Sequence, residues 1–441
     1  MFDTREKPRL VESAFLVGAY FDRADEATAR SLLEELGELV STLGITVLAK
    51  ECVFVRTRSK RYFTGSGKAI ELMDAAREAG ADCIVFDNEL APAQQRAWET
   101  EGDITVIDRE EVILDIFKMR ARTKEARLQV ELAQMQYSLP RLARMWSHLD
   151  RQRGASGGGT GGAARGEGEQ QIAVDRRLAR KRIDRIKEDL EDIRRNRQTQ
   201  RKQRTDEGIC QASIVGYTNA GKSSLLNLLS GSDVLAEDKL FATLDPTTRR
   251  IELPDGQPLL LTDTVGFVRN LPHRLVEAFK ATLEEAVIAD FLIHVLDASA
   301  PEIFAFYETT LSVLQELKAA DKPTIIVLNK IDLIEDESRL HELKRHFDRN
   351  SVFVSIHTGE GIPALINRLA DMMVDRVSRM SLRLPQARQD LVALLHREGK
   401  LVNHEYEGND ILVTAIIPHA LRHHFEPFRN PAVATGTDRT A

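Results

Sequence analysis

The sequence predicts an α/β multidomain protein with four parts: a small N-terminal α/β domain, a basic helical hairpin, a doubly wound α/β domain and a small C-terminal α/β domain. The length of 441 residues corresponds to about three domains of roughly 150 residues. Apolar runs of strand length alternate with amphipathic stretches along both larger domains, and a charged, glycine-rich region separates the two. The expected domain boundaries are 1–119, 120–207, 208–379 and 380–441.

The composition excludes several classes of protein. Hydrophobic residues make up 42% of the chain and charged residues 29%, as in ordinary folded proteins. The sequence contains no apolar run of the roughly 20 residues that a bilayer span needs, and its first residues lack the apolar core of a signal peptide. The three cysteines lie far apart, which argues against a disulfide framework or a structural zinc site. We therefore expect a cytoplasmic protein without a membrane span.

The N-terminal domain is expected to contain a largely parallel sheet. Apolar runs predict strands at 14–20, 45–48, 83–86 and 104–107, and amphipathic stretches predict helices at 24–43 and 68–78. The sequence Gly65-Ser66-Gly67-Lys68 resembles half of a phosphate-binding loop, but Tyr62 stands where the motif requires a glycine. We therefore favour a tight turn over a nucleotide site here.

A basic helical hairpin is expected to follow. Charged, helix-forming stretches at 110–140 and 172–203 flank the glycine-rich run 154–162. Residues 121–205 contain 21 basic and 11 acidic residues, a net charge of +10 in a chain whose formal net charge is −7. Such a localised excess suggests contact with a polyanion such as RNA, although a solvated face with i,i+4 ion pairs is an alternative. The candidate RNA-contacting residues are Arg176, Arg177, Arg180, Lys181, Arg182 and Arg185.

The strongest motif fits Gly-x4-Gly-Lys-Ser and lies between a strand at 212–215 and a helix at 224–229. Its glycines allow successive backbone N–H groups to face phosphate oxygens at a helix N-terminus. The Lys222 ammonium would reach the β- and γ-phosphates, and the Ser223 hydroxyl would coordinate Mg²⁺. The predicted phosphate-binding residues are Gly216, Tyr217, Thr218, Asn219, Ala220, Gly221, Lys222, Ser223 and Ser224.

A second motif predicts guanine specificity. Asn329, Lys330, Ile331 and Asp332 directly follow the apolar strand expected at 324–328. A carboxylate at the end of such a strand can accept hydrogen bonds from both N1–H and the exocyclic N2–H of guanine, a donor pair that adenine does not present. GTP is therefore favoured over ATP.

Two further segments are expected to sense the γ-phosphate. Asp263, Thr264, Val265 and Gly266 follow the strand 259–262; Asp263 would hold Mg²⁺ through water, and the Gly266 amide would contact the γ-phosphate. Upstream, the first switch is placed at Phe241, Ala242, Thr243, Leu244 and Asp245. Thr243 is our choice for the second hydroxyl on Mg²⁺, with Thr247 and Thr248 as alternatives. The order of these motifs predicts a doubly wound P-loop GTPase domain.

Phe267 follows Gly266 at the position where many small GTPases have a glutamine that orients the attacking water. A phenyl ring cannot perform this role. We therefore assign no side chain to water orientation and expect slow intrinsic hydrolysis that a partner, a rearranged loop or a bound ion accelerates.

The combined pattern resembles the HflX family of ribosome-associated GTPases, within the wider Obg-HflX group. The residues that carry the resemblance are 62–68, 88–95, 165–169, 241–247 and 263–267. The resemblance implies binding to the large ribosomal subunit, with the N-terminal region directed towards the peptidyl-transferase centre. Members can split stalled ribosomes, and ATP hydrolysis and RNA-helicase activity have also been attributed to members. The loop that supports the guanine would be Ser355, Ile356 and His357, where most relatives have Ser-Ala-x.

Beyond the nucleotide-binding domain, a helix at 390–398 and a strand at 411–417 predict the small C-terminal domain, and the tail from 430 onward is expected to fray. The favoured function is that of a monomeric, GTP- and Mg²⁺-dependent factor that associates with the large ribosomal subunit. Two alternatives remain: an RNA-remodelling ATPase regulated by its GTPase domain, and a GTPase switch with a non-ribosomal protein partner.

Overall fold

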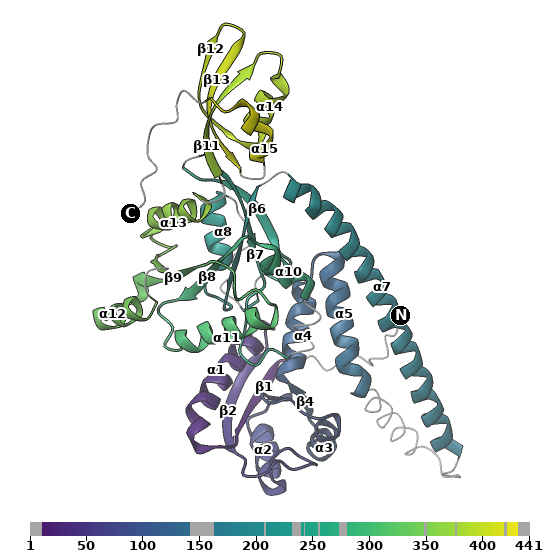
Figure 1. The fold of residues 1–441 in the computed structure, drawn as a ribbon. Helices are drawn as coiled ribbons and strands as arrows, with labels where there is room; N and C mark the ends of the chain where they lie inside the picture. Colours follow the sequence, from purple (N-terminus) through teal and green to yellow (C-terminus); the bar gives the residue numbers. More distant parts are fainter. Residues whose placement is uncertain are drawn as a thin grey trace. The chain divides into compact units, whose positions relative to one another are not determined.

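The structure is a computed structural model of the 441-residue chain (Figure 1). It describes residues 11–141, 163–206, 209–231, 240–241, 243–254, 256–272, 280–347, 351–374, 377–418 and 421–430. The chain divides into two compact units. The first comprises residues 1–192, 237–244 and 269–279, and the second comprises residues 193–236, 245–268 and 280–441. Two short segments from the middle of the chain thus belong to the unit that is formed mainly by the N-terminal half.

The first unit is built around a four-stranded parallel sheet of order β2-β1-β3-β4. Because β1 and β3 lie inside this sheet and are almost wholly buried, their sequences are nearly continuous apolar runs. The predicted small parallel α/β domain is confirmed. Its elements are β1 (Ser13–Tyr20), a 3₁₀ turn (Arg23–Asp25), α1 (Glu26–Thr42), β2 (Thr46–Phe54), α2 (Ser66–Glu78), β3 (Cys83–Phe86), α3 (Pro92–Gly102) and β4 (Thr105–Asp108).

The tight turn predicted at Gly65-Ser66-Gly67-Lys68 is wrong. Helix α2 begins at Ser66, and Gly65 is its N-cap residue in an extended conformation. The Lys68 ammonium pairs with Glu71 one turn further along the helix at 3.0 Å. The two glycines therefore mark the start of a helix.

The first arm of the predicted hairpin is two helices, α4 (Arg109–Arg120) and α5 (Lys124–Ser138), followed by a 3₁₀ turn (Leu139–Arg141). The expected continuous helix over 110–140 is wrong because the backbone of Ala121 is extended and Thr123 caps α5, its hydroxyl accepting a hydrogen bond from the Ala126 N–H at 3.1 Å. Side chains such as Thr compete with helical backbone bonds, which favours a break at this position.

The second arm is the single helix α7 (Ala163–Asp206), which begins nine residues before the expected start at 172. Ile183 and Ile186 are buried, and the Arg182 guanidinium forms two hydrogen bonds, of 2.8 and 3.0 Å, with the Glu131 carboxylate on α5. The glycine-rich run 154–162 lies outside the described residues. Helices α5 and α7 are therefore held together along the hairpin (Figure 1).

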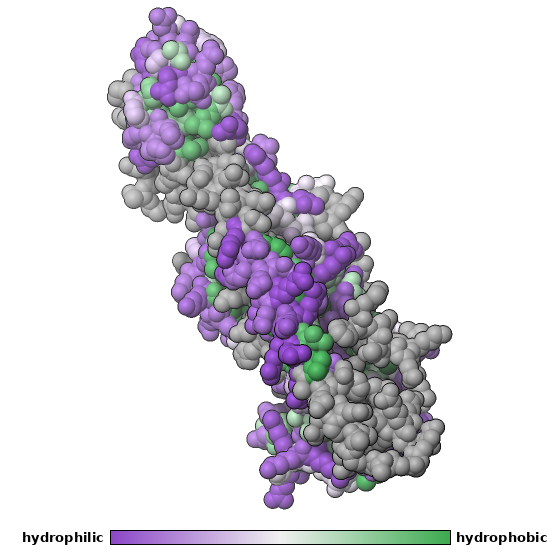
Figure 2. Space-filling model, turned by 90° about the vertical axis from the view of Figure 1, so that its right-hand side faces the viewer, coloured by the Kyte–Doolittle hydropathy of each residue, from purple (hydrophilic) through white to green (hydrophobic). Residues whose placement is uncertain are grey.

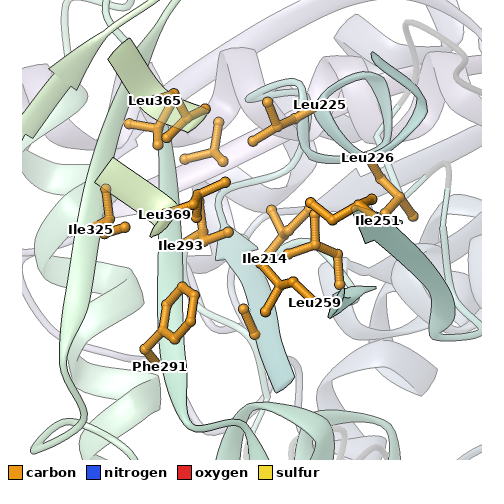
Figure 3. Packing of buried hydrophobic residues seen from close by; sticks show 14 of the residues in the cluster. Ile214, Leu225, Leu226, Ile251, Leu259, Phe291, Ile293, Ile325, Leu365 and Leu369 are labelled. Carbon is orange, nitrogen blue, oxygen red and sulfur yellow. The ribbon is translucent and has the colours of Figure 1, made fainter. Parts of the chain in front are cut away.

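The second unit contains a six-stranded sheet of order β10-β9-β8-β5-β7-β6, in which only β6 is antiparallel to its neighbour. Ile214, Leu259, Ile293 and Leu365 are among the apolar residues that fill the core beside the sheet (Figure 3). The elements are β5 (Cys210–Gly216), α8 (Lys222–Ser230), β6 (Thr247–Glu252), β7 (Pro258–Asp263), α10 (Lys280–Ile288), β8 (Phe291–Asp297), α11 (Ile303–Glu316), β9 (Thr324–Asn329), a 3₁₀ turn (Ile331–Leu333), α12 (Glu337–His346), β10 (Ser351–Phe353) and α13 (Ile362–Val374).

The strand order places a topological switch point beside β5. The chain passes from β5 to β6 and β7 on one side and then crosses to β8 on the other. In parallel α/β sheets, ligands bind outside the carboxyl ends of the strands at such a point. Gly216, Asp263, Asp297 and Asn329 are the last residues of β5, β7, β8 and β9, so this edge is where a ligand is expected.

The C-terminal part of the second unit is an antiparallel sheet of order β11-β13-β12. Leu384, Leu395, Ile417 and Phe425 belong to its separate apolar core. Its elements are β11 (Val377–Pro385), α14 (Gln389–Glu398), β12 (Lys400–Glu407), β13 (Asp410–Pro418), α15 (Arg422–Phe425) and a 3₁₀ turn (Glu426–Phe428). The small C-terminal α/β domain is confirmed, and β11 and β12 are additions to the expected elements. Across the residues that the structure describes, no helix combines the length and apolar character needed to cross a bilayer.

Candidate functional site

The Gly-x4-Gly-Lys-Ser loop connects β5 to α8, as the sequence predicts. Gly216 and Gly221 have positive φ angles of 145° and 98°. A Cβ atom at Gly216 would lie 2.2 Å from the Val295 carbonyl oxygen, and one at Gly221 would lie 2.4 Å from the Asn329 side-chain amide nitrogen. Both positions therefore require glycine, because of the backbone conformation and because a side chain has no space. With these two glycines, the backbone amides of the loop lie at the N-terminus of α8, where a phosphate group binds.

Lys222 is the first residue of α8, and its side chain is buried within this loop. Its ammonium group donates a hydrogen bond of 2.7 Å to the Tyr217 carbonyl across the loop. Burial lowers the pKa of Lys222 to about 8, although the nearby Asp263 carboxylate acts in the opposite direction. A bound polyphosphate would supply the negative charge that favours the ammonium form.

Ser223 and Asp263 bring two oxygen ligands together. The Ser223 hydroxyl donates a hydrogen bond of 2.6 Å to the Asp263 carboxylate. Asp263 ends β7 and lies opposite Ile214 of β5, which places its buried carboxylate beside the phosphate-binding loop. Hydroxyl and carboxylate oxygens are the ligands that Mg²⁺ prefers, so this donor set fits the predicted metal.

The residues after Asp263 are fastened to the phosphate-binding loop. The Thr264 hydroxyl donates to the Ile214 carbonyl at 2.7 Å, the Thr218 N–H donates to the Phe267 carbonyl at 2.8 Å, and the Phe267 N–H donates to the Gly216 carbonyl at 3.1 Å. Val265 is also buried. The Phe267 ring is 1% exposed, so the position that holds glutamine in many GTPases carries an apolar, core-packed side chain.

Gly266 lies against both the loop and its lysine. A Cβ atom at Gly266 would lie 2.7 Å from Thr218 Cγ2 and 2.9 Å from the Lys222 ammonium nitrogen. The Gly266 backbone therefore occupies space next to the group that is expected to hold the terminal phosphates.

The base-recognition motif begins in β9 and continues beyond its end. The Asn329 side chain connects two loops: its amide nitrogen donates to the Ala220 carbonyl at 2.9 Å, and its amide oxygen accepts from the Ile356 N–H at 3.2 Å. Asp332 is exposed and is the second residue of the 3₁₀ turn Ile331–Leu333. Ser355 is buried, Ile356 half-buried and His357 exposed. The loops that the sequence assigns to the guanine are thus brought together by one side chain.

Sequence reasoning missed Asp297 at this edge. Its carboxylate pairs with the Lys330 ammonium at 2.7 Å, and Lys330 has a positive φ of 64°. Asp297 ends the buried strand β8. An acidic residue at the end of an apolar run was the available signal.

The first switch segment is divided between the two units. Residues 237–244 belong to the first unit, and Asp245 belongs to the second. Within the first unit, Phe241 is buried, has a positive φ of 56°, and packs edge-to-face on Phe117 with ring centroids 4.6 Å apart. Thr243 is half-buried and Leu244 buried, whereas Ala242 lies outside the described residues.

The two alternatives to Thr243 lie in β6. The hydroxyl groups of Thr248 and Thr262 share a hydrogen bond of 2.9 Å, so Thr248 is already engaged within the sheet. Thr247 lies opposite Asp263 in the antiparallel register. The choice of Thr243 over Thr247 remains a prediction.

The candidate RNA-contacting residues all lie on α7 and are exposed. Figure 2 views the molecule from the side that carries α7 in Figure 1, and the coloured surface of this face is largely hydrophilic. Arg182 differs from the others because it is paired with Glu131. The other candidate RNA-contacting residues are Arg176, Arg177, Arg180, Lys181 and Arg185.

The doubly wound sheet, the glycine-constrained loop and the Lys222, Asp263 and Asn329 positions define the class of P-loop GTPases. Three family models match the chain: GTP-binding GTPase N-terminal at residues 30–118, GTP-binding GTPase Middle Region at 120–204, and 50S ribosome-binding GTPase at 211–330. The chain belongs to the HflX family of GTPases and is a GTP-hydrolysing enzyme.

Two curated relatives illustrate the extent of the similarity. GTPase HflX of Akkermansia muciniphila is 58% identical over 97% of this chain and 99% of its own length. GTPase HflX of Escherichia coli K12 is 43% identical over 85% of this chain and 86% of its own length. Among solved structures, a GTP-binding protein from Sulfolobus solfataricus in complex with GDP is 22% identical, covers 82% of this chain and 99% of its own, and has a TM-score of 0.42.

Proposed function

We propose that this GTPase associates with the large ribosomal subunit and couples its nucleotide state to ribosome binding, splitting or rescue. The observation that carries the proposal is the exposed row of basic side chains on α7, in a chain whose overall charge is negative. Ribosomal RNA is a polyanion that such a row can contact. The family-model description of a 50S ribosome-binding GTPase for residues 211–330 supports the same partner.

The nucleotide is held by backbone amides of the 216–223 loop, and the Lys222 ammonium binds its terminal phosphates. The hydrogen bonds of Asn329 to Ala220 and Ile356 position the two loops for the guanine, whose N1–H and N2–H donate to the exposed Asp332 carboxylate. The Ser355, Ile356 and His357 loop completes the base site.

Ser223, Asp263 and Thr243 are the proposed magnesium-binding residues, with Asp263 acting through water. The hydrogen bond between Ser223 and Asp263 supports the first two assignments. When bound, Mg²⁺ neutralises charge that develops on the phosphate oxygens during transfer. The buried Phe267 leaves the orientation of water to another group, so we expect hydrolysis by the isolated protein to be slow.

The ribosome association is tested by co-sedimentation of the full chain with purified ribosomal subunits. Samples contain a non-hydrolysable GTP analogue, GDP or no nucleotide, each at two salt concentrations. We expect binding to the large subunit that requires the GTP analogue and weakens as salt rises, because counterions are released from RNA on binding. Binding to neither subunit in any nucleotide state would contradict the proposal.

A matched pair of triple variants assigns the role of α7. Arg176→Gln, Arg177→Gln and Arg180→Gln together should weaken binding and reduce the salt slope, by about one unit for each lost phosphate contact. The control replaces three exposed arginines elsewhere by glutamine: Arg30, Arg77 and Arg388. Equal effects of the two triple variants would show that α7 has no special role.

The two alternative functions predict different results. Binding to a protein partner in place of the ribosome predicts weak salt dependence and no effect of added RNA. An RNA-remodelling ATPase predicts RNA-stimulated ATP hydrolysis that persists when the phosphate-binding loop is disabled by Lys222→Ala.

A further inference from the structure

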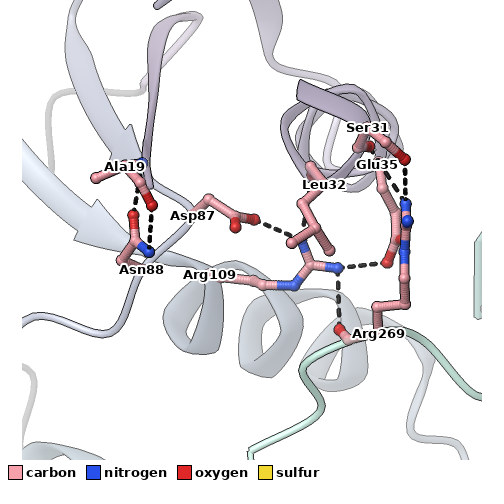
Figure 4. Close-up of polar contacts among 8 residues, drawn as sticks. All are labelled: Ala19, Ser31, Leu32, Glu35, Asp87, Asn88, Arg109 and Arg269. Atoms are coloured by element: carbon pink, nitrogen blue, oxygen red, sulfur yellow. Dashed lines mark hydrogen bonds and ion pairs between the residues drawn. The ribbon is translucent and has the colours of Figure 1, made fainter. Parts of the chain in front are cut away.

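The first unit contains a buried cluster of two arginines and two carboxylates (Figure 4). Arg109, at the start of α4, pairs with Glu35 of α1 and with Asp87, the latter at 2.6 Å. Arg269 pairs with the other oxygen of Glu35 at 2.8 Å. The four side chains are between 3% and 11% exposed, so each charge depends on its partners for compensation.

Arg269 is held through both its side chain and its backbone. Its guanidinium donates to the Ser31 hydroxyl at 2.8 Å and to the Ser31 carbonyl at 3.3 Å. The Arg109 guanidinium donates to the Arg269 carbonyl at 3.1 Å. Such double anchoring fixes the course of the backbone at residue 269 as well as the position of its side chain.

The position of Arg269 in the sequence connects this cluster to the nucleotide site. Arg269 follows Gly266, the expected γ-phosphate sensor, by three residues. At the other end of this short link, Phe267 is hydrogen-bonded to the phosphate-binding loop through Thr218 and Gly216. The two ends of the short link 267–269 are therefore each anchored by hydrogen bonds, and Gly266 directly precedes this link.

Helix α4 also holds the first switch segment. Arg109 contacts the backbone of Arg269 from the first turn of α4, and Phe117 contacts Phe241 two turns later. Helix α4 of the N-terminal domain therefore contacts two segments. One begins with Arg269 and follows Gly266, the expected γ-phosphate sensor. The other contains Phe241 and the proposed magnesium-binding residue Thr243.

We propose that Glu35, Arg109 and Arg269 are positioning residues for GTP hydrolysis, which keep Gly266 beside the phosphate-binding loop and so favour GTP over GDP. The cluster acts through the backbone that joins Arg269 to Gly266. This inference rests on the proposed role of the Gly266 amide as γ-phosphate sensor. By linkage, GTP binding stabilises the held position of Arg269 to the same extent.

The test compares nucleotide affinities of the full chain and its variants by fluorescence titration with a labelled non-hydrolysable GTP analogue and labelled GDP. Glu35→Gln keeps the shape of the side chain and removes its charge. We expect it to weaken binding of the GTP analogue about tenfold while GDP affinity changes less than about twofold, and to lower kcat with it. Arg269→Gln should act in the same way, and Arg269→Lys should restore part of the preference.

The matched control is Glu26→Gln, which breaks an exposed ion pair with Arg30 on the same helix. It should leave both affinities unchanged. In a double-mutant cycle, Glu35→Gln combined with Arg269→Gln should lose little more GTP preference than either change alone, because both release the same segment.

A purely structural role is separated by thermal unfolding of each variant. If Glu35→Gln and Arg269→Gln both fold but retain the full preference for the GTP analogue, the inference is wrong. Equal weakening of both nucleotides would also overturn it. Failure of the proposed nucleotide site is a distinct outcome, since Lys222→Ala would then leave the affinity for both nucleotides intact.

Discussion

Single residues at the edge of the second sheet perform their roles because of what surrounds them. Lys222 is buried at the start of α8, and the hydrogen bond to Tyr217 and the proximity of Asp263 offset part of the lost solvation. Burial therefore leaves its ammonium easier to deprotonate than an exposed lysine. A polyphosphate reverses this effect because its charge favours the protonated form.

The depressed pKa of Lys222 predicts proton uptake on nucleotide binding in alkaline solution. The pKa of free Lys222 is about 8 and should rise when phosphates bind, so between pH 8 and about 10 the complex holds a proton that the free protein lacks. Affinity should accordingly fall as pH rises above 8.

Calorimetric titration with GDP at pH 9, in two buffers of different ionisation enthalpy, measures this uptake. We expect a fraction approaching one proton at pH 9 and little uptake at pH 7, where Lys222 is already charged. Equal heats in both buffers at pH 9 would contradict the assignment of the lysine to the phosphates.

At the scale of elements, a buried polar network fixes the base of the hairpin in the first unit. Asp108 caps α4 and accepts a hydrogen bond from the Tyr137 hydroxyl of α5 at 3.1 Å. Arg141 pairs with Asp108 at 3.3 Å and donates to the Leu90 carbonyl at 2.8 Å and the Gln95 side chain at 3.1 Å. Burial raises the pKa of Asp108 above its ordinary value, although the Arg141 charge acts in the opposite direction.

Removing Arg141 should therefore destabilise the first unit. Arg141→Gln leaves the Asp108 carboxylate buried without its ion-pair partner, a change that typically costs about 3–5 kcal/mol. The control Arg77→Gln, which breaks an exposed pair with Asp74, should cost less than about 1 kcal/mol. Denaturant unfolding provides the measurement, and similar losses for both variants would contradict the role of the network.

The elements themselves were largely predictable because local signals determine them. Apolar runs predicted β1, β3, β7 and β9 correctly, and the phosphate-binding motif was placed between a strand and a helix as required. The break between α4 and α5 was missed, although Thr123 is a recognisable N-cap, because the charged, helix-forming composition continues through it. Strands β11 and β12 were missed because polar and charged residues interrupt their apolar positions.

At the scale of the whole molecule, the least predictable feature was the return of middle segments to the N-terminal unit. Arg269 and Glu35 are 234 positions apart, and no local pattern connects them. Charged side chains are usually exposed, so nothing in the helical stretch at 24–43 distinguished Glu35 as a buried ion-pair partner. The positions of the candidate site residues at strand ends were predictable because their motifs are local, whereas the cluster that holds Arg269 depends on tertiary structure.

At the scale of the whole molecule we also propose that the hydrolysis site of this GTPase is incomplete in the isolated chain and that the large ribosomal subunit completes it. The buried Phe267 and the exposed basic face of α7 are the two observations behind this claim. If both observations have the role proposed, the rate of hydrolysis depends on the presence of this partner.

The most direct test is the single-turnover rate of GTP hydrolysis by the full chain, alone and with purified large ribosomal subunits, with small subunits as the control. We predict slow hydrolysis by the protein alone and an acceleration on the order of 10³ by large subunits, within the range that partners provide to other GTPases. An unchanged rate with large subunits, or equal acceleration by both subunits, would contradict the proposal that the large subunit completes the hydrolysis site.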